Sequence, residues 1–185
     1  MSTPFDPARL GQQIEGSTDI PPLEQWNPEF CGDIDMHITA DGRWLYEGSP
    51  IGREAMVRMF SRILWREGDR YFLKTPVEKV GIQVDDVPFQ VTQVESQRGD
   101  RGAELIFTTA TGDRVRADAE HPIRVETDPK TGEPSPYLMI RFGMEGRIVR
   151  NLFYQLVELG RMVEHPDGTE LVVDSAGETF SLGRV

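Results

Sequence analysis

The sequence is poor in the features that would point to secretion, membranes or nucleic acid. Cys31 is its only cysteine, so the chain cannot form an internal disulfide or a zinc site that needs several thiolates. No apolar run is long enough to span a bilayer, and the N-terminus lacks a basic region followed by an apolar one. The formal net charge of -11 argues against extended contact with phosphates. We therefore expect a cytoplasmic protein that binds neither a membrane nor extended nucleic acid.

Common signatures of catalysis are also missing. The patterns GxSxG, GxxxxGK[ST] and GxGxxG after a strand are not found. His121 and His165 each precede a proline, and neither belongs to an HxxxH or HExxH pattern. We therefore expect no metal and no cofactor, and we favour a protein without catalytic activity.

The stretch "CGDIDMHI" (residues 31–38) could still be a metal or acid/base site. Strand alternation places Asp33, Asp35 and His37 on one face, where they could hold a divalent cation or exchange protons. Such triples more often form the solvated face of a strand, and metal sites usually draw ligands from more than one element. We favour the solvated face, and we expect Cys31 to be a buried structural residue.

The length of 185 residues allows one ordinary domain or two small ones. Residues 1–25 contain four prolines and little periodicity, which predicts an extended N-terminal arm. Residues 26–85 then form a predicted N-terminal α+β module, and residues 86–185 form a C-terminal α+β module.

Hydrophobic periodicity predicts the elements of the first module. Alternation from Ile34 to Ile38, the turn at Asp41-Gly42 and the stretch "RWLYEG" predict a β-hairpin. The next stretch, "GREAMVRMFSRILW", has apolar residues at helical spacing as far as Ile63 and Leu64. Two short strands follow, one on each side of Thr75-Pro76.

The second module is predicted to be mostly strands. Strand follows strand beyond Asp86, until a second helix runs from Glu145 to Leu159. The segment from Leu171 to Leu182 then predicts a final hairpin. Two principal helices without a βαβ rhythm indicate an α+β fold with mainly antiparallel sheets.

The two modules resemble each other, which predicts an internal duplication. "RWLYEG" before the first helix compares with "LMIRFG" before the second, and "MVRMF" compares with "IVRNLF". Glu78, Val80 and Ile82 fall opposite Glu178, Phe180 and Leu182. We expect modules that begin near Ile34 and Pro136 to share a strand, a helix and a hairpin, with a ligand cleft between them.

The pattern "CGDIDM" followed by "DG-W-Y-G-PI-R", with "TPVEK" and "DDVPF" further on, resembles the bacterial domain of unknown function 1285 family. The resemblance runs from about Trp26 to the C-terminus and is strongest before Phe89. It implies a duplicated α+β core of two domains, the second loosely similar to pleckstrin homology domains, with a ligand site between them. It also implies a nucleotide-like ligand and a part in signal transduction, without an established activity.

Polar and aromatic residues near the expected junction of the modules are the candidates for ligand binding. They are Arg43, Trp44, Tyr46, Arg53, Lys74, Thr75 and Glu78 in the first module, and Arg141 and Tyr154 in the second. An aromatic ring can stack on a base while a cation neutralises a phosphate. The alternative is that each aromatic is a core residue and each arginine a solvated surface group.

Three functions are consistent with the sequence. The leading hypothesis is a non-catalytic protein that binds a small anionic ligand, such as a nucleotide, and signals to a protein partner. Its net charge does not forbid this, because Arg43, Arg53 and Lys74 could meet at one rim and set the local field. The alternative is a hydrolase or other enzyme that uses Asp33, Asp35 or Glu78 with a divalent metal. The third is an interaction scaffold without a small ligand.

Overall fold

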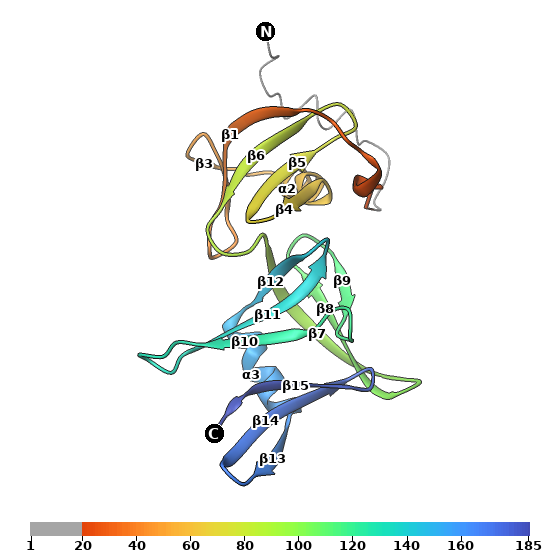
Figure 1. Cartoon of the computed structure of the whole chain (residues 1–185), viewed down its shortest axis with the longest axis vertical. Helices are drawn as coiled ribbons and strands as arrows, with labels where there is room; N and C mark the ends of the chain where they lie inside the picture. Colours follow the sequence, from red (N-terminus) through yellow and green to blue (C-terminus); the bar gives the residue numbers. More distant parts are fainter. Residues whose placement is uncertain (1–19) are drawn as a thin grey trace. The chain divides into compact units, whose positions relative to one another are not determined.

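The computed structural model describes residues 20–185, which divide into two units after Asp86 (Figure 1). Unit 1 ends at Asp86, and unit 2 runs Val87–Val185. Most of the expected N-terminal arm lies outside the described residues. Its last part includes the short 3-10 helix η1 (Leu23–Gln25), in which the Leu23 side chain is fully buried.

Unit 1 is one mixed sheet with a helix. In chain order its elements are β1 (Phe30–Ile38), β2 (Trp44–Tyr46), β3 (Ser49–Pro50), α2 (Glu54–Arg62), β4 (Leu64–Glu67), β5 (Arg70–Lys74) and β6 (Lys79–Val84). The sheet order is β3-β2-β1-β6-β5-β4, and every neighbouring pair is antiparallel except β1 and β6. The first and last strands of the unit therefore lie side by side at the centre of the sheet.

The helix of unit 1 packs through a narrow apolar stripe. Phe60 is fully buried, and its ring stacks on Trp44 of β2 with 6.4 Å between the ring centroids. Arg53 and Arg58, on the other side of α2, are exposed. The amphipathic pattern thus fixes which face of α2 meets the sheet.

Unit 2 contains two sheets and one helix. Its elements are β7 (Phe89–Gly99), β8 (Gly102–Thr109), β9 (Arg114–Arg116), β10 (Ile123–Thr127), β11 (Pro134–Arg141), β12 (Met144–Ile148), α3 (Arg150–Leu159), β13 (Arg161–His165), β14 (Gly168–Ser175) and β15 (Glu178–Arg184). The larger sheet has the order β10-β11-β12-β7-β8-β9, and the smaller one β13-β14-β15. Only β12 and β7 pair in parallel within these sheets of unit 2.

A buried hydroxyl joins the two sheets of unit 2. Ala117 N donates to Leu105 O (3.0 Å), as in an ordinary antiparallel pair. The reverse bond is made through Ser175: Leu105 N donates to its Oγ (2.9 Å), which donates to Ala117 O (2.7 Å). Ala176 N also donates to Ala103 O (3.0 Å). We call this junction of β8, the end of β9 and the β14–β15 turn the seam.

Two predicted helix boundaries were wrong. The first helix ends at Arg62, and Leu64 already pairs with Leu73 in the β4–β5 ladder. The second helix begins at Arg150, because residues 144–148 form β12 with alternating burial between β11 and β7. In both places an apolar residue that fits the helical period belongs to a strand, so tertiary pairing overrides the local pattern.

The chain contains an internal duplication, because its two halves repeat one order of elements. Each contains a hairpin, a helix and three antiparallel strands in the same order: β2-β3-α2-β4-β5-β6 in unit 1 and β11-β12-α3-β13-β14-β15 in unit 2. Both hairpins turn on a residue pair with positive φ, Glu47-Gly48 and Phe142-Gly143. The predicted final hairpin is confirmed as β14–β15. Together these elements make an α+β architecture of mostly strands with two α-helices among residues 20–185.

Within residues 20–185, neither α-helix combines the length and apolar composition that a bilayer crossing requires.

Candidate functional site

Three of the predicted site residues lie together at the turn from β5 to β6. Thr75 Oγ1 accepts hydrogen bonds from the backbone of Val77 (3.3 Å) and Glu78 (3.1 Å), and Thr75 N donates to Glu78 O (2.8 Å). Lys74, Thr75 and Glu78 are all buried. The hydroxyl therefore closes the turn, which is a structural role for Thr75.

Lys74 has an unusual environment for a lysine. Its side chain is 3% exposed, and Nζ lies 3.8 Å from the centroid of the Trp65 ring. Burial lowers the pKa of the ammonium, although the charge of Glu67 partly opposes this. Glu67 itself is bound by Lys79 Nζ (3.0 Å) and by Trp65 Nε1 (3.2 Å). Lys74 is thus held on an aromatic face and does not extend into solvent.

The predicted rim of three cations is wrong. Arg43 follows the Ile38 end of β1, whereas Lys74 pairs with Lys79, which lies opposite Phe30 at the other end of that strand. Arg43 is exposed and binds the carboxylate of Asp41 (3.2 Å). Arg53 is exposed at the N-terminus of α2. Because β1 and β6 run in parallel, Arg43 and Lys74 lie at opposite ends of the sheet.

The two aromatic candidates of unit 1 are parts of the fold. Trp44 is 5% exposed and stacks on Phe60, so it is a core residue. Tyr46 is half-buried at the end of β2, opposite Met36. Trp44 therefore offers no open ring to a ligand.

Arg141 forms a nearly enclosed ion pair in unit 2. Its guanidinium lies 3.2 Å from the carboxylate of Asp113 and 4.9 Å from the ring centroid of Phe89. Burial lowers the pKa of Arg141, while the Asp113 carboxylate raises it in opposition. Burying two charges is costly unless each has a partner, and here each is the partner of the other. We therefore assign Arg141 a structural role at the end of β11.

The side chains of the "CGDIDMHI" stretch bind separate partners. Asp33 binds Arg70 (2.5 Å), and His37 Nε2 lies 2.6 Å from the Asp85 carboxylate. No metal-binding cluster of histidine, cysteine and carboxylate side chains occurs among residues 20–185. Cys31 is exposed, so the expectation that it is a buried structural residue was wrong.

A pocket of about 250 Å³ lies beside the N-terminal half of α3. Its lining includes Tyr154, the one predicted residue of unit 2 that is well exposed, at 58%. The other lining residues are Glu133, Pro134, Pro136, Arg147, Ile148, Arg150 and Phe153. We call this the α3 pocket. Its lining thus includes two arginines, two aromatic residues and one glutamate.

The charges of the α3 pocket are placed by short local contacts. Arg150 Nη2 lies 2.5 Å from the Glu133 carboxylate, and both side chains are mainly exposed. Arg147 Nη1 donates to Tyr137 Oη (3.3 Å), and its guanidinium carbon lies 5.3 Å from that ring centroid. The sequence prediction did not include Arg147 or Arg150. Arg147 lies in β12 and Arg150 begins α3, and two arginines three residues apart in the sequence were the available signal.

Comparison with known proteins decides the family of the chain. A family model described as "Domain of unknown function (DUF1285), N-terminal domain" matches residues 21–87, and one described as "Protein of unknown function (DUF1285), C-terminal domain" matches residues 88–182. The chain belongs to the DUF1285 family. The resemblance seen in the sequence is thereby confirmed.

Two solved DUF1285 structures are similar to this chain. One is a DUF1285 family protein from Silicibacter pomeroyi DSS-3, with 47% identity, a TM-score of 0.87, and coverage of 99% of this chain and 97% of that one. The other is from Shewanella baltica OS155, with 28% identity, a TM-score of 0.53, and coverage of 66% of this chain and 90% of that one. No curated protein matched the chain. The family description assigns no activity.

Proposed function

We propose that this DUF1285 protein is a non-catalytic module that binds a small anionic ligand in the α3 pocket. The observation that carries the proposal is that two arginines, Arg147 and Arg150, and two aromatic residues, Phe153 and Tyr154, line one hollow. A planar anion needs these two kinds of group, since the cations match its charge and the rings match its flat face.

The exposure of the groups supports exchange with a ligand. The side chain of Arg150 is 70% exposed and its partner Glu133 58%, so their ion pair is weak and an anion can replace the carboxylate. The volume of about 250 Å³ is below the usual range for drug-sized ligands. We expect the pocket to hold a phosphate or carboxylate and one ring, with the rest of a larger ligand such as a nucleotide outside it.

Other parts of the sequence-based hypothesis stay predictions. These are a cleft between the modules, a protein partner in signalling, a cytoplasmic location and a loose likeness of unit 2 to pleckstrin homology domains. The hydrolase alternative gains no support, because Asp33 is bound to Arg70 and Glu78 lies in the buried turn of Thr75.

Thermal denaturation with a set of nucleoside monophosphates, inorganic phosphate and benzoate tests the proposal, each with and without Mg²⁺. A ligand that binds only the folded state raises the melting temperature. Calorimetric titration of the best ligand should then show that Arg150→Gln weakens binding roughly tenfold, as expected for one partly exposed charge-assisted contact. Tyr154→Ala should weaken a ligand that contains a ring more than it weakens phosphate.

Arg114→Gln is the matched control. Arg114 is also a mainly exposed arginine of unit 2 in an ion pair, with Glu95, but it does not line the α3 pocket. It should leave the affinity unchanged. The proposal fails if none of these anions raises the melting temperature, or if both arginine variants weaken binding equally.

A further inference from the structure

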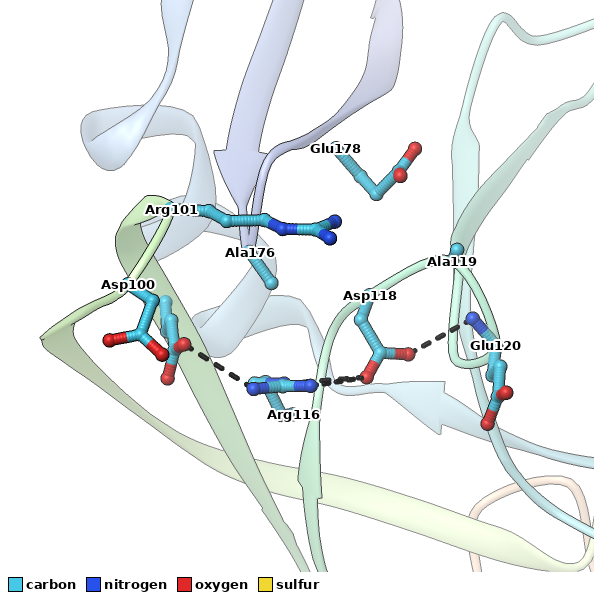
Figure 2. Close-up of a pocket in the computed structure, with 9 residues that line it drawn as sticks. Asp100, Arg101, Arg116, Asp118, Ala119, Glu120, Ala176 and Glu178 are labelled. Atoms are coloured by element: carbon cyan, nitrogen blue, oxygen red, sulfur yellow. Dashed lines mark hydrogen bonds and ion pairs between the residues drawn. The ribbon is translucent and has the colours of Figure 1, made fainter.

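A second and larger pocket lies at the seam of unit 2. Its volume is about 440 Å³, and it is open to solvent between the β7–β8 turn, β9, the loop after β9 and the β14–β15 turn (Figure 2). The lining residues are Asp100, Arg101, Glu104, Arg116, Asp118, Ala119, Glu120, Ala176 and Glu178. We call this the seam pocket. It contains five carboxylates and two guanidinium groups, so its charge differs in kind from that of the α3 pocket.

Three of these charged groups, Arg116, Glu104 and Asp118, are joined to one another by ion pairs. Arg116 donates to Glu104 Oε1 (3.3 Å) and to Asp118 Oδ2 (3.3 Å). Asp118 also accepts hydrogen bonds from the backbone of Glu120 (3.0 Å) and from His121 (2.9 Å). Burial opposes the charge of Asp118, but the bonds from His121 and Arg116 outweigh it and lower the pKa of that carboxyl. These groups are already paired and do not need a ligand.

The remaining charged groups have no such partners within residues 20–185. The side chains of Arg101, Asp100, Glu120 and Glu178 make no hydrogen bond or ion pair there. The stem of Arg101 lies against Gly177, where a Cβ atom would come within 3.0 Å of Arg101 Cδ. In Figure 2, Arg101 and Asp100 lie on the side of the β7–β8 turn, while Glu178 and Glu120 lie on the other. The unpaired groups of the pocket are therefore one cation, Arg101, and three carboxylates, two of which face Arg101 from the other side.

We propose that the seam pocket binds a small zwitterionic amine, such as a basic α-amino acid. The carboxylate of the ligand would meet Arg101, and its ammonium groups would meet Glu178 and Glu120. A purely anionic ligand would face the excess of carboxylates, and a purely cationic one would leave Arg101 unmatched beside Arg116. Only a ligand with both charges, positive overall, complements the two sides together.

The affinity should be modest. Arg101 and Glu120 are exposed, so water screens each contact. We expect a dissociation constant of roughly a millimolar for L-lysine at low salt.

Calorimetric titration with three related probes tests both sides of the pocket. L-lysine has a carboxylate and two ammonium groups, cadaverine lacks the carboxylate, and 6-aminohexanoate lacks the α-ammonium. L-lysine should bind about fivefold to tenfold more tightly than either of the others. Arg101→Gln should remove its advantage over cadaverine, and Glu178→Gln should weaken L-lysine and cadaverine alike.

Arg98→Gln and Glu158→Gln are the matched controls. Arg98 is an exposed arginine on the same hairpin as Arg101, and Glu158 is an exposed glutamate on α3; neither lines the seam pocket. Both should bind L-lysine like the unchanged protein. The proposal is overturned if L-lysine gives no saturable binding up to about 10 mM, if cadaverine binds as tightly, or if Arg98→Gln weakens binding as much as Arg101→Gln.

Discussion

Unit 1 and unit 2 share an order of elements, but different strands pair in parallel in the two units. In unit 1 the first strand, β1, pairs in parallel with the last, β6, and all six strands form one sheet. In unit 2 the corresponding strands, β10 and β15, lie close together but belong to different sheets. There β12 pairs in parallel with β7, the first of three strands that have no counterpart in unit 1.

The difference shows which part of the repeat is robust. The helix and the three antiparallel strands after it form from neighbouring segments, and both units keep them. The parallel pairing joins segments far apart in the chain, and it differs between the units. Contacts between neighbouring segments therefore define the repeated module. The long-range parallel pairing is added differently in each copy.

The largest expected effect breaks the contact between α2 and the sheet of unit 1. Phe60 is fully buried in α2, so Phe60→Ala should lower the free energy of unfolding by about 3 to 5 kcal/mol. Trp26, Trp44 and Trp65 are the three tryptophans of the chain, and all lie in unit 1. Urea denaturation followed by tryptophan fluorescence therefore reports this change directly. A loss below about 1 kcal/mol would show that α2 is not part of the core.

A smaller effect is expected from the glycine of the parallel pair in unit 2. Gly146 lies opposite Phe89, and a Cβ there would come within 2.7 Å of Val91 Cγ2 and 3.1 Å of Phe89 Cβ. These atoms belong to buried side chains, so Gly146→Ala should lower the free energy of unfolding by about 1 to 3 kcal/mol. Urea denaturation followed by far-UV circular dichroism measures it. An unchanged transition would mean that β12 and β7 can separate without loss.

The smallest effect is expected from the glycine of the parallel pair in unit 1. Gly81 lies opposite Asp33, and a Cβ there would meet the ion pair of Asp33 and Arg70 at 2.0 and 2.8 Å. Both side chains are mainly exposed and can move away, and an exposed pair contributes little. Gly81→Ala should therefore change the free energy of unfolding by less than about 1 kcal/mol in the fluorescence experiment. If it costs as much as Gly146→Ala, the two parallel pairs are equivalent after all.

Local turn chemistry and periodicity were enough to predict much of the fold. The hairpin through Asp41-Gly42 and the strands on each side of Thr75-Pro76 are confirmed as β1–β2 and β5–β6. The helix ends could not be predicted, because Ile63 and Ile148 fit a helical period. The strands at these two places are fixed by their pairing, β4 with β5 and β12 with β7. Periodicity is a property of one segment, whereas a β-strand forms only when it pairs with a second segment.

The candidate sites were harder to predict than the fold. Arg43 and Lys74 come from the same unit, and their separation follows from the parallel pairing of β1 with β6, which a periodic pattern within one segment cannot reveal. Tyr154 was predicted and does line a pocket, but the arginines beside it were not. The seam pocket depends on strands β7–β9 meeting the β14–β15 turn, a contact over a long sequence distance.

The Ser175 hydroxyl gives the Leu105 amide a partner that belongs to another sheet. A strand amide ordinarily becomes accessible to deuterium when its own ladder frays, whereas this amide is released when the two sheets part. Its exchange rate is therefore a measure of the opening of the seam alone. A molecule that fastens the two sheets together would slow the exchange of this one proton and leave the other amides of β8 as they were.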